Sequence, residues 1–404
     1  MIARRRAVRP KRIVVYCPLP EGGIAEHAHY QANALARAGI ETVVLTSQAF
    51  LPDHQSKAYV VLPWLAPVYA KSGPRLMRAI YFAATTVINE AIFAFRILVW
   101  GPRQVLVAAT SERLALLWVW PHVVLRSLGV RYAANIHDPQ RKRLSGSKLT
   151  HRLSILAGFL PIEFGLLHED FSSDQPDIPR HVSCLPVPYG CYQADIEPGD
   201  GDALRAALTG GAKTKTVFLS FGYIADRKNI DLCIRAIASL PEAVLVVAGR
   251  VASSHDKPAA WYRALAEELG CADRVRIDDG FVADSAIREY FGACDVVLLT
   301  YKAEFVSQSG VLLLASNWAK PVLASSGPGP LSKTVREFDI GLTVAPDDVE
   351  ALREAMKQLV EHCHTADGWS KFREHATWDR NVAVLLDAFS GEGVDERTKV
   401  EERA

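Results

Sequence analysis

The stretch that most constrains the fold is residues 304–322, EFVSQSGVLLLASNWAKPV, because two apolar runs enclose it. Residues 295–300 (DVVLLT) precede it, and residues 322–324 (VLA) follow Lys320 and Pro321. A strand, a turn of small residues, a helix and a second strand form a βαβ unit, which is the building block of parallel sheets. The sequence therefore predicts an α/β fold here.

The turn of this unit can receive an anion. It consists of Ser307, Gln308, Ser309 and Gly310, and we expect the helix to begin near Val311. A helix N-terminus presents unpaired N–H groups and about half a positive charge, and a glycine lets an anion approach the backbone closely. The turn is a candidate cradle for a diphosphate. The alternative is a well-packed unit with an ordinary Ser-Gly turn.

The chain of 404 residues is long enough for two domains with separate cores. Its seven cysteines include no CxxC pair. Scattered thiols suit a reducing cytosol and argue against a structural zinc site. The basic N-terminus runs directly into a strand, which is not the pattern of a secretory signal. We therefore expect a cytoplasmic protein.

Charge is distributed unevenly along the chain. Residues 1–195 carry 22 Lys and Arg against 13 Asp and Glu, a net of +9, and the remainder carries 24 against 32, a net of −8. A basic first half suggests an anionic partner, either a membrane surface or a phosphorylated acceptor. Nucleic acid is disfavoured, because no aromatic-basic motif of the known modules is present.

The first half opens with a second βαβ pattern. A strand at residues 13–16 leads into a loop with Gly22 and Gly23, followed by a helical pattern over residues 25–38 and a strand at 40–45. Ligands bind at the carboxyl ends of such strands. The loop is not GxGxxG, so a dinucleotide-binding dehydrogenase is disfavoured. The alternative for the two glycines is a simple turn.

Residues 75–100 are apolar and long enough to span a bilayer, but Arg78, Asn89, Glu90 and Arg96 interrupt them. We expect one or two domain helices here, and a transmembrane helix is disfavoured; one face lying on a membrane is an open alternative. Packing into a core is the alternative, as it is for the similarly apolar residues 114–128.

A strand at residues 130–136 ends in His137, where active sites of α/β proteins form. Arg141, Lys142 and Arg143 follow, and they are a candidate patch for lipid headgroups or an acceptor phosphate. The alternative is a solvated loop.

The second half repeats the α/β pattern. A strand at residues 216–220 is followed by Gly222 and then by Arg227 and Lys228 at the start of a helix, which suits two phosphate-binding cations. Ordinary surface charge is the alternative. Residues 196–212, rich in Gly, Asp and Ala, have the composition of an interdomain linker.

We therefore expect five segments along the chain. They are a first domain over 1–195, a linker over 196–212, a second domain over 213–377, a terminal helix over 378–390 packing back on the first domain, and a disordered tail over 391–404.

Taken together, these motifs resemble GT-B glycosyltransferases of the retaining family 4 type. In the second half the resemblance follows the order Phe221-Gly222, Lys228-Asn229, Gly280-Phe281-Val282, Ser309-Gly310-Val311-Leu312 and Ala319-Lys320-Pro321-Val322. In the first half it rests on Gly22-Gly23-Ile24, His137-Asp138-Pro139 and Pro188-Tyr189-Gly190. It implies a GT-B fold, with two Rossmann-like domains facing an interdomain cleft.

The resemblance also implies roles for individual residues. The second domain would bind a nucleoside diphosphate sugar, with Lys228 on the phosphates and the Phe281-Val282 segment on the base. The family's usual arginine falls on Tyr223, so Arg227 would substitute for it. The amides of Gly22 and Gly23 would approach the diphosphate. His137 would lie near the transferred sugar, and Glu304 would hydrogen-bond its hydroxyls, so His137, Lys228 and Glu304 are the catalytic candidates.

One departure from the family concerns its second glutamate, which falls on Leu314 and would contact the nucleotide ribose. A Ser-Gly-Val-Leu variant also occurs in the family. Two rivals therefore stay open: another GT-B nucleotide-sugar enzyme of the epimerase type, and a non-catalytic nucleotide-sugar-binding protein.

The expected reaction is a metal-independent hexosyl transfer with retention to a lipid-linked or saccharide acceptor, in surface polysaccharide or glycoconjugate synthesis. No DxD motif lies where a metal site is expected, and no cofactor is expected beyond the donor substrate. An anionic membrane is an expected partner, at the inner face of the plasma membrane.

Overall fold

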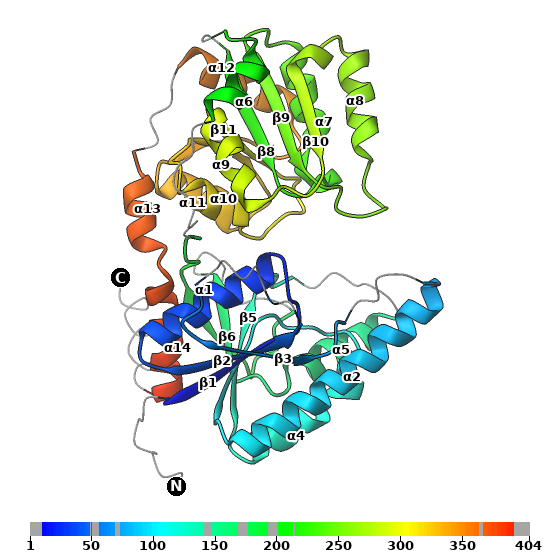
Figure 1. Cartoon of the computed structure of the whole chain (residues 1–404), viewed down its shortest axis with the longest axis vertical. Helices are drawn as coiled ribbons and strands as arrows, with labels where there is room; N and C mark the ends of the chain where they lie inside the picture. The colour runs from blue at the N-terminus through cyan, green and yellow to red at the C-terminus, as the bar shows by residue number, and fades with distance from the viewer. Residues whose placement is uncertain are drawn as a thin grey trace. The chain divides into compact units, whose positions relative to one another are not determined.

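A computed structural model describes residues 10–48, 50, 56–68, 73–140, 147–168, 177–192, 201–212, 215–362 and 367–391. The chain divides into two compact units, and each is described here by itself. Unit 1 comprises residues 1–190 and 377–404, and unit 2 comprises residues 191–376. Figure 1 shows the elements of both.

Unit 1 contains a parallel seven-stranded sheet in the order β3-β2-β1-β4-β5-β6-β7. The strands are β1 (Arg12–Cys17), β2 (Glu41–Ser47), β3 (Val60–Leu65), β4 (Gln104–Val107), β5 (Arg131–Ile136), β6 (Phe164–His168) and β7 (Ser183–Val187). The helices are α1 (Gly23–Arg37), α2 (Arg75–Trp100), α3 (Ala115–Trp118), α4 (Trp120–Ser127), α5 (Lys148–Phe159) and α14 (Trp378–Ser390). Strand order reverses between β1 and β4, which is the position where ligands bind in such sheets.

The first core lies between this sheet and helices α2, α4 and α5. Phe93 of α2, Leu125 of α4 and Phe159 of α5 pack on Tyr16 and Tyr132 of the sheet. Helix α1 packs with α14, where the rings of Tyr30 and Trp378 stack at 5.8 Å. Helix α14 is part of unit 1 although 186 residues separate it from the rest of that unit.

Unit 2 contains a parallel six-stranded sheet in the order β10-β9-β8-β11-β12-β13. The strands are β8 (Thr216–Phe221), β9 (Ala243–Gly249), β10 (Val275–Asp279), β11 (Val296–Thr300), β12 (Val322–Ser325) and β13 (Gly341–Thr343). The helices are α6 (Asp202–Thr209), α7 (Ile230–Ala238), α8 (Ala259–Glu268), α9 (Asp284–Ala293), α10 (Gly310–Ala315), α11 (Pro330–Glu337), α12 (Val349–Glu361) and α13 (Trp369–His375). Short 3₁₀ turns occur at Asp226–Lys228 and Ala272–Arg274. The order reverses between β8 and β11.

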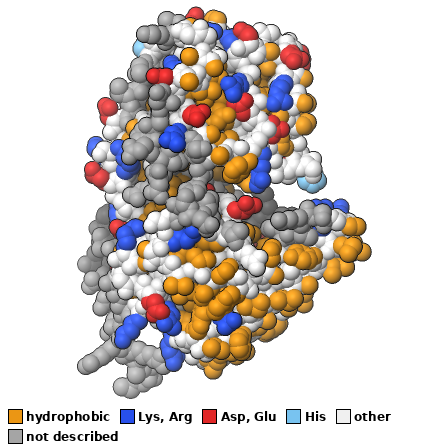
Figure 2. Space-filling view, viewed as in Figure 1, with side chains coloured by type: hydrophobic (Ala, Val, Ile, Leu, Met, Phe, Trp, Pro, Cys, Tyr) orange, Lys and Arg blue, Asp and Glu red, His pale blue; other side chains and the backbone are white. Residues whose placement is uncertain are grey.

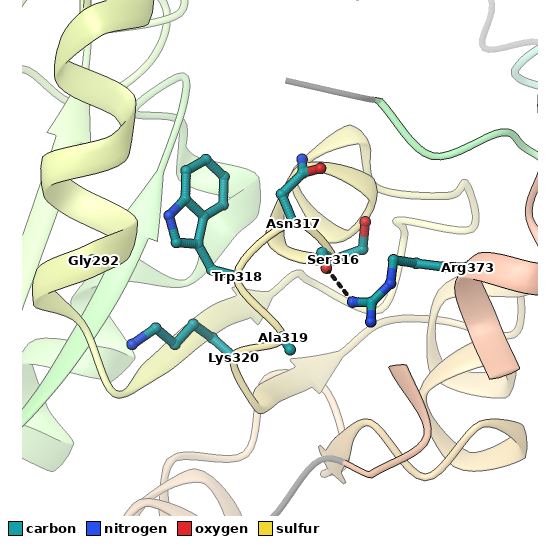
Figure 3. A pocket seen from close by; sticks show the side chains of 7 residues that line it. All are labelled: Gly292, Ser316, Asn317, Trp318, Ala319, Lys320 and Arg373. Carbon is teal, nitrogen blue, oxygen red and sulfur yellow. Dashed lines mark hydrogen bonds between the residues drawn. The ribbon is translucent and has the colours of Figure 1, made fainter. Parts of the chain in front are cut away.

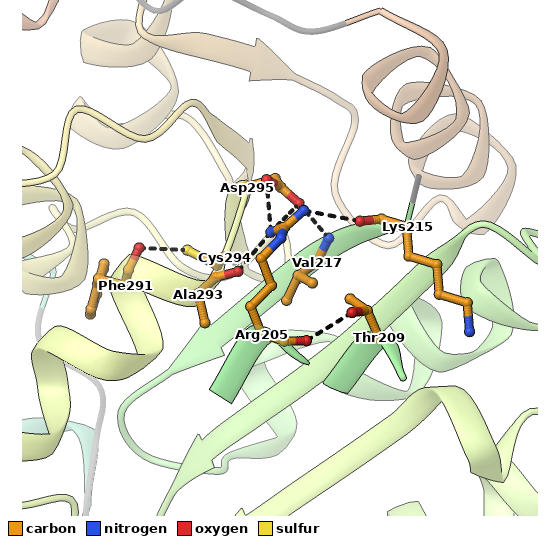
Figure 4. Close-up of polar contacts among 8 residues, drawn as sticks. All are labelled: Arg205, Thr209, Lys215, Val217, Phe291, Ala293, Cys294 and Asp295. Carbon is orange, nitrogen blue, oxygen red and sulfur yellow. Dashed lines mark hydrogen bonds and ion pairs between the residues drawn. The ribbon is translucent and has the colours of Figure 1, made fainter. Parts of the chain in front are cut away.

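Residues 202–209, which the sequence suggested as part of a linker, form helix α6 of unit 2. Arg205 of this helix binds both carboxylate oxygens of Asp295 at 3.0 and 2.9 Å and the carbonyl oxygens of Ala293 and Lys215 at 2.9 and 3.1 Å (Figure 4). Asp295 also accepts from the backbone N–H of Val217 at 2.8 Å. This network ties α6 to the strands that begin beside it, so the linker prediction is wrong for these residues. Residues 193–200 lie outside the described part.

Candidate functional site

In unit 2 the predicted residues gather where the strand order reverses. Gly222, Arg227 and Lys228 follow β8, and the loop that begins at Tyr301 follows its neighbour β11. The backbone N–H of Lys302 donates to the carbonyl oxygen of Arg227 at 2.9 Å, and the Thr300 hydroxyl donates to that of Lys228 at 2.9 Å. These bonds hold the two segments together at the carboxyl edge of the sheet, where α/β proteins bind ligands.

Lys228 is a buried cation at this edge of the sheet. Its side chain is 7 % exposed, and its ammonium donates to the carbonyl oxygen of Phe221. Burial, and secondarily the charge of Arg227, lower the pKa of Lys228 to about 7. An ammonium has more N–H donors than one carbonyl oxygen can accept from. A bound anion would accept from the remaining donors and would replace the stabilisation by water that burial has removed.

Gly222 lies beside this ammonium, and its backbone carries no side chain. Its φ is +86°, which favours glycine, and a Cβ at this position would lie 3.5 Å from the Lys228 Nζ atom. The carbonyl oxygen of Gly222 would in turn lie 2.0 Å from a Cβ on Gly249. Two glycines at the ends of β8 and β9 thus allow a close approach that side chains would block.

Arg227 is exposed and held by aromatic rings. Its guanidinium lies 5.5 Å from the ring centroid of Tyr301 and 5.6 Å from that of Phe305, and the two rings stack at 3.9 Å. Cation–π contact orients the guanidinium without neutralising it. Arg227 therefore remains able to pair with an anion near Lys228.

The turn before α10 has a defined hydrogen-bond pattern. The hydroxyls of Ser309 and Tyr301 are 2.9 Å apart, the Ser309 N–H donates to Gln308 Oε1 at 3.0 Å, and Gln308 Nε2 donates to Thr334 at 3.1 Å. Helix α10 begins at Gly310 and spans six residues. Because the side chains of Gln308 and Ser309 are engaged within the protein, the N–H groups of the first helical turn are what this segment can offer a ligand. Ser307 is half-buried beside them.

Three further predicted residues lie at the same edge of the sheet. Glu304 is exposed in the loop after β11. Phe281, with 82 % of its surface exposed, and the half-buried Val282 follow β10, two strands away from β8. A ring as exposed as that of Phe281 suits a stacking partner such as a nucleobase.

Arg250 is a cation that the sequence reasoning missed. It follows β9 directly, donates to the Tyr223 hydroxyl at 3.1 Å and lies 5.3 Å from the centroid of that ring. Its place after a buried strand ending in glycine is the signal that could have identified it. Tyr223, which occupies the position of the family's usual arginine, thus has an arginine beside it.

In unit 1 the glycine pair opens α1. Gly22 precedes the helix with φ +84°, and Gly23 is its first residue, two residues earlier than expected. His137 follows β5, and its Nε2 donates to the Ala108 carbonyl oxygen at 3.0 Å. The glycines and His137 thus follow β1 and β5, which flank β4 in the sheet.

His137 belongs to a cluster of rings in unit 1. The His27 ring lies 4.8 Å from each of His137, Tyr189 and Trp378, and His168 stacks on Tyr189 at 4.6 Å. Burial, and then His137, lower the pKa of His27 well below its usual range and that of His168 to about 3. Both therefore stay neutral at physiological pH and support His137 by packing.

The patch of Arg141, Lys142 and Arg143 lies outside the described residues. Within the described ranges, no group of three or more His, Cys, Asp or Glu side chains could hold a metal ion.

A hollow of about 560 Å³ lies elsewhere in unit 2 (Figure 3). Residues 316–320 and Arg373 form most of its lining, and Arg373 donates to the Ser316 carbonyl oxygen at 2.7 Å. Residues 316–320 precede β12, so the hollow is at the amino edge of the sheet, opposite to the predicted site. None of the predicted site residues lines it.

Comparison with known proteins gives a family match over part of the chain and a fold. Residues 209–374 match the family "Glycosyl transferases group 1". The chain is 30 % identical over 204 residues to D-inositol 3-phosphate glycosyltransferase of Mycobacterium marinum, covering 48 % of the chain and 42 % of that protein. It is 31 % identical over 229 residues to the enzyme of that name in Stackebrandtia nassauensis, covering 52 % and 49 %. The chain thus spans about half the length of the curated relatives it matches.

Solved structures resemble the whole chain. Sucrose-phosphate synthase from Thermosynechococcus elongatus has a TM-score of 0.70 at 18 % identity, covering 94 % of this chain and 97 % of that one. HepE from Anabaena in complex with UDP-glucose has a TM-score of 0.63 at 15 % identity, covering 94 % and 98 %. At these identities the likeness concerns the fold alone.

Proposed function

We propose that the protein, a chain of GT-B fold in which residues 209–374 match the family "Glycosyl transferases group 1", transfers a sugar from a nucleoside diphosphate sugar. The observation that carries the proposal is the buried ammonium of Lys228 beside the bare backbone of Gly222. A buried cation with unused donors and an open approach is suited to a diphosphate.

The difficult step of such a transfer is departure of the nucleoside diphosphate from the anomeric carbon. Negative charge then grows on the diphosphate, and donors already in place stabilise it without reorganisation. Lys228 and Arg227 supply two positive charges, Arg250 is a candidate third, and the N–H groups at Gly310 supply dipoles. With this set of donors we propose that the transfer is independent of metal, and from the resemblance to the retaining family 4 type we propose that it proceeds with retention.

The remaining predicted residues concern the sugar. In this proposal Glu304 hydrogen-bonds its hydroxyls, His137 contacts the transferred sugar, and the amides of Gly22 and Gly23 bind the diphosphate. A His137→Gln variant that turns over donor as the wild type does would remove His137 from the catalytic set.

For the acceptor we propose a phosphorylated sugar or cyclitol, free or lipid-linked, in glycoconjugate or polysaccharide synthesis. The relatives' name, D-inositol 3-phosphate glycosyltransferase, supports a phosphorylated acceptor, and so does the net charge of +9 in residues 1–195.

Calorimetry with a panel of nucleoside diphosphates and their sugars tests the donor. Because a diphosphate favours the charged form of Lys228, binding near pH 8 should take up a proton. This uptake changes the measured heat between buffers of different ionisation enthalpy. A product assay with phosphorylated acceptors then tests the transfer. Absence of binding to every nucleotide would overturn the proposal.

A second candidate is a nucleotide-sugar-binding protein without transfer activity. Leu314, half-buried in α10, occupies the position of the family's second glutamate and cannot accept a hydrogen bond from a ribose. Tight binding with neither transfer nor hydrolysis would favour this candidate. Conversion of the donor without any acceptor would favour the epimerase type instead.

A further inference from the structure

Helix α2 of unit 1 exposes large apolar side chains and, beside the apolar residues that it buries, also buries polar ones. The side chains that it buries against the unit include Asn89 and Glu90. The side chains that it exposes are large and apolar, and they include Met77, Ile80, Ile88, Phe95, Leu98 and Val99. The first five are separated by three, eight, seven and three residues, each close to a whole number of helical turns, so they lie along one stripe, and Val99 lies beside it. A large exposed apolar stripe of this kind marks a surface that binds another protein or a membrane.

The buried polar residues fix α2 along the body of unit 1. Glu90 accepts from the Tyr16 hydroxyl at 2.8 Å and lies 2.8 Å from the Nε2 atom of His122. Asn89 donates to the Ala66 carbonyl oxygen and accepts from the Ala66 N–H, both at 2.8 Å. Although α2 has the length and hydropathy to cross a membrane, crossing would break these bonds and expose Phe93, which is fully buried.

The neighbouring helices continue the apolar surface. Leu117, Trp120 and Val124 are exposed on α3 and α4, and Leu149, Leu153 and Leu156 are exposed on α5. Helix α3 contacts α2, α4 and α5, so the surface is continuous. Figure 2 shows hydrophobic side chains gathered over the region of α2 and α4. We call the exposed apolar side chains of α2, α3, α4 and α5 the docking face.

The charges on these helices have one sign. Six cationic side chains lie on them, none of them buried: Arg75, Arg78, Arg96, Arg126, Lys148 and Arg152. Their one carboxylate, that of Glu90, is buried. Arg96 lies 3.6 Å from the ring centroid of Trp64 in a cation–π contact, and tryptophan is enriched at membrane–water interfaces.

We infer that the docking face lies on a bilayer containing anionic lipids, with α2 parallel to the membrane plane. Apolar stripes enter the acyl boundary while cations of the same helices pair with headgroup phosphates. A protein partner would require complementary carboxylates and a shaped apolar surface, whereas a bilayer supplies both kinds of contact without specific pairing. The membrane would be a partner of the proposed transferase, and all the observations that indicate it concern residues of unit 1.

Vesicle flotation of the full chain tests the inference without any donor, so its failure leaves the proposed transfer unaffected. We expect flotation with vesicles containing about a third phosphatidylglycerol, and at least about fivefold weaker binding to pure phosphatidylcholine vesicles. Raising the salt from about 50 mM to about 500 mM should weaken the binding to anionic vesicles. No binding to anionic vesicles, or equal binding to both compositions, would overturn the inference.

The variant Ile88→Glu/Phe95→Glu places charge on two exposed positions of α2, so the fold should be retained by circular dichroism. We expect at least about tenfold weaker binding to anionic vesicles. The matched control is Trp261→Glu, which adds charge at an exposed apolar side chain of unit 2 and should bind as the wild type. Equal losses in both variants would overturn the inference.

Two further outcomes would contradict it. If sedimentation shows a dimer that the double variant abolishes, and no lipid binding is seen, the docking face is an interface between copies of the chain. If the protein stays with vesicles in alkaline carbonate, α2 is inserted across the bilayer. Release by carbonate supports the parallel arrangement.

Discussion

The ammonium of Lys228 donates a hydrogen bond to the backbone carbonyl oxygen of Phe221, the last residue of β8. This contact holds a buried cation at the carboxyl edge of the sheet, where the strand order of unit 2 reverses. Burying a cation costs free energy unless an anion compensates it. The diphosphate of the proposed donor would supply this anion.

Replacing Lys228 should therefore impair the reaction. We expect Lys228→Ala to lower donor turnover at least tenfold, because one charge-assisted contact to the leaving group is lost. The measurement is nucleoside diphosphate release with saturating acceptor. The control is Lys257→Ala, a half-buried lysine of unit 2 whose Nζ lies 4.2 Å from the Trp261 ring. Unchanged turnover in Lys228→Ala would remove this residue from the site.

The same lysine should make the stability of the free protein depend on alkaline pH. Its pKa in the folded protein is about 7, whereas an unfolded lysine titrates near 10.4. Between these values the unfolded state binds more protons, so the free energy of unfolding should increase as the pH rises from about 7 to about 10, by up to about 4 kcal/mol. Urea unfolding across this range, compared with Lys228→Met, measures the effect. Parallel curves for the two proteins would contradict it.

The sequence predicted those parts of unit 2 in which apolar runs are bounded by turns. The strands expected at residues 216–220 and 295–300 agree with β8 and β11. Lys228 was identified from its place after a strand. Its burial was not, because burial depends on residues far along the chain, such as Thr300.

The parts that sequence reasoning missed depend on such distant contacts. Helix α6 has the composition of a linker, but Arg205 binds Asp295, 90 residues away. Strand β3 contains Pro63 and lies at the edge of the sheet, where a proline is tolerated. On α2 the polar Asn89 and Glu90 face inward, the reverse of what a hydrophobic pattern indicates for a helix on a protein surface.

Arg205 gives a direct test of how α6 is held. Removing its guanidinium in Arg205→Ala deletes the contacts to Asp295, Ala293 and Lys215 and leaves a carboxylate without its cation. We expect a loss of about 2–3 kcal/mol in the free energy of unfolding. Hydrogen exchange at the α6 amides should accelerate. The control is Arg235→Ala, at an exposed arginine of α7, and equal effects of the two variants would contradict the role of Arg205.

Glu90 should contribute strongly to the stability of unit 1. Burial, and then the Glu90 carboxylate, raise the pKa of Tyr16, so its hydroxyl remains a donor to Glu90. Glu90→Ala would leave the buried Tyr16 hydroxyl and His122 without this acceptor, at a cost of about 3–5 kcal/mol. Glu90→Gln, which retains one acceptor oxygen, should lose less. Thermal denaturation measures the loss of stability in both variants. A loss below about 1 kcal/mol in Glu90→Ala would contradict this role, because that is the contribution of a contact between exposed charges.

His168 should make unit 1 sensitive to acid. Its pKa in the folded protein is about 3, while an unfolded histidine titrates near 6.5. Below pH 6.5 the side chain of His168 is therefore protonated in the unfolded state but stays neutral in the folded state. The stability present above pH 6.5 is lost as the pH falls towards 3, by about 3 kcal/mol at pH 4.

In His168→Phe, which preserves stacking on Tyr189 but cannot titrate, the free energy of unfolding should fall less steeply between pH 6.5 and 4. Hydrogen exchange of the β6 amides follows unit 1 specifically, and the exposed His255 of unit 2 provides the control as His255→Gln. If His168→Phe retains the acid dependence of the wild type, protonation of His168 is not what destabilises unit 1.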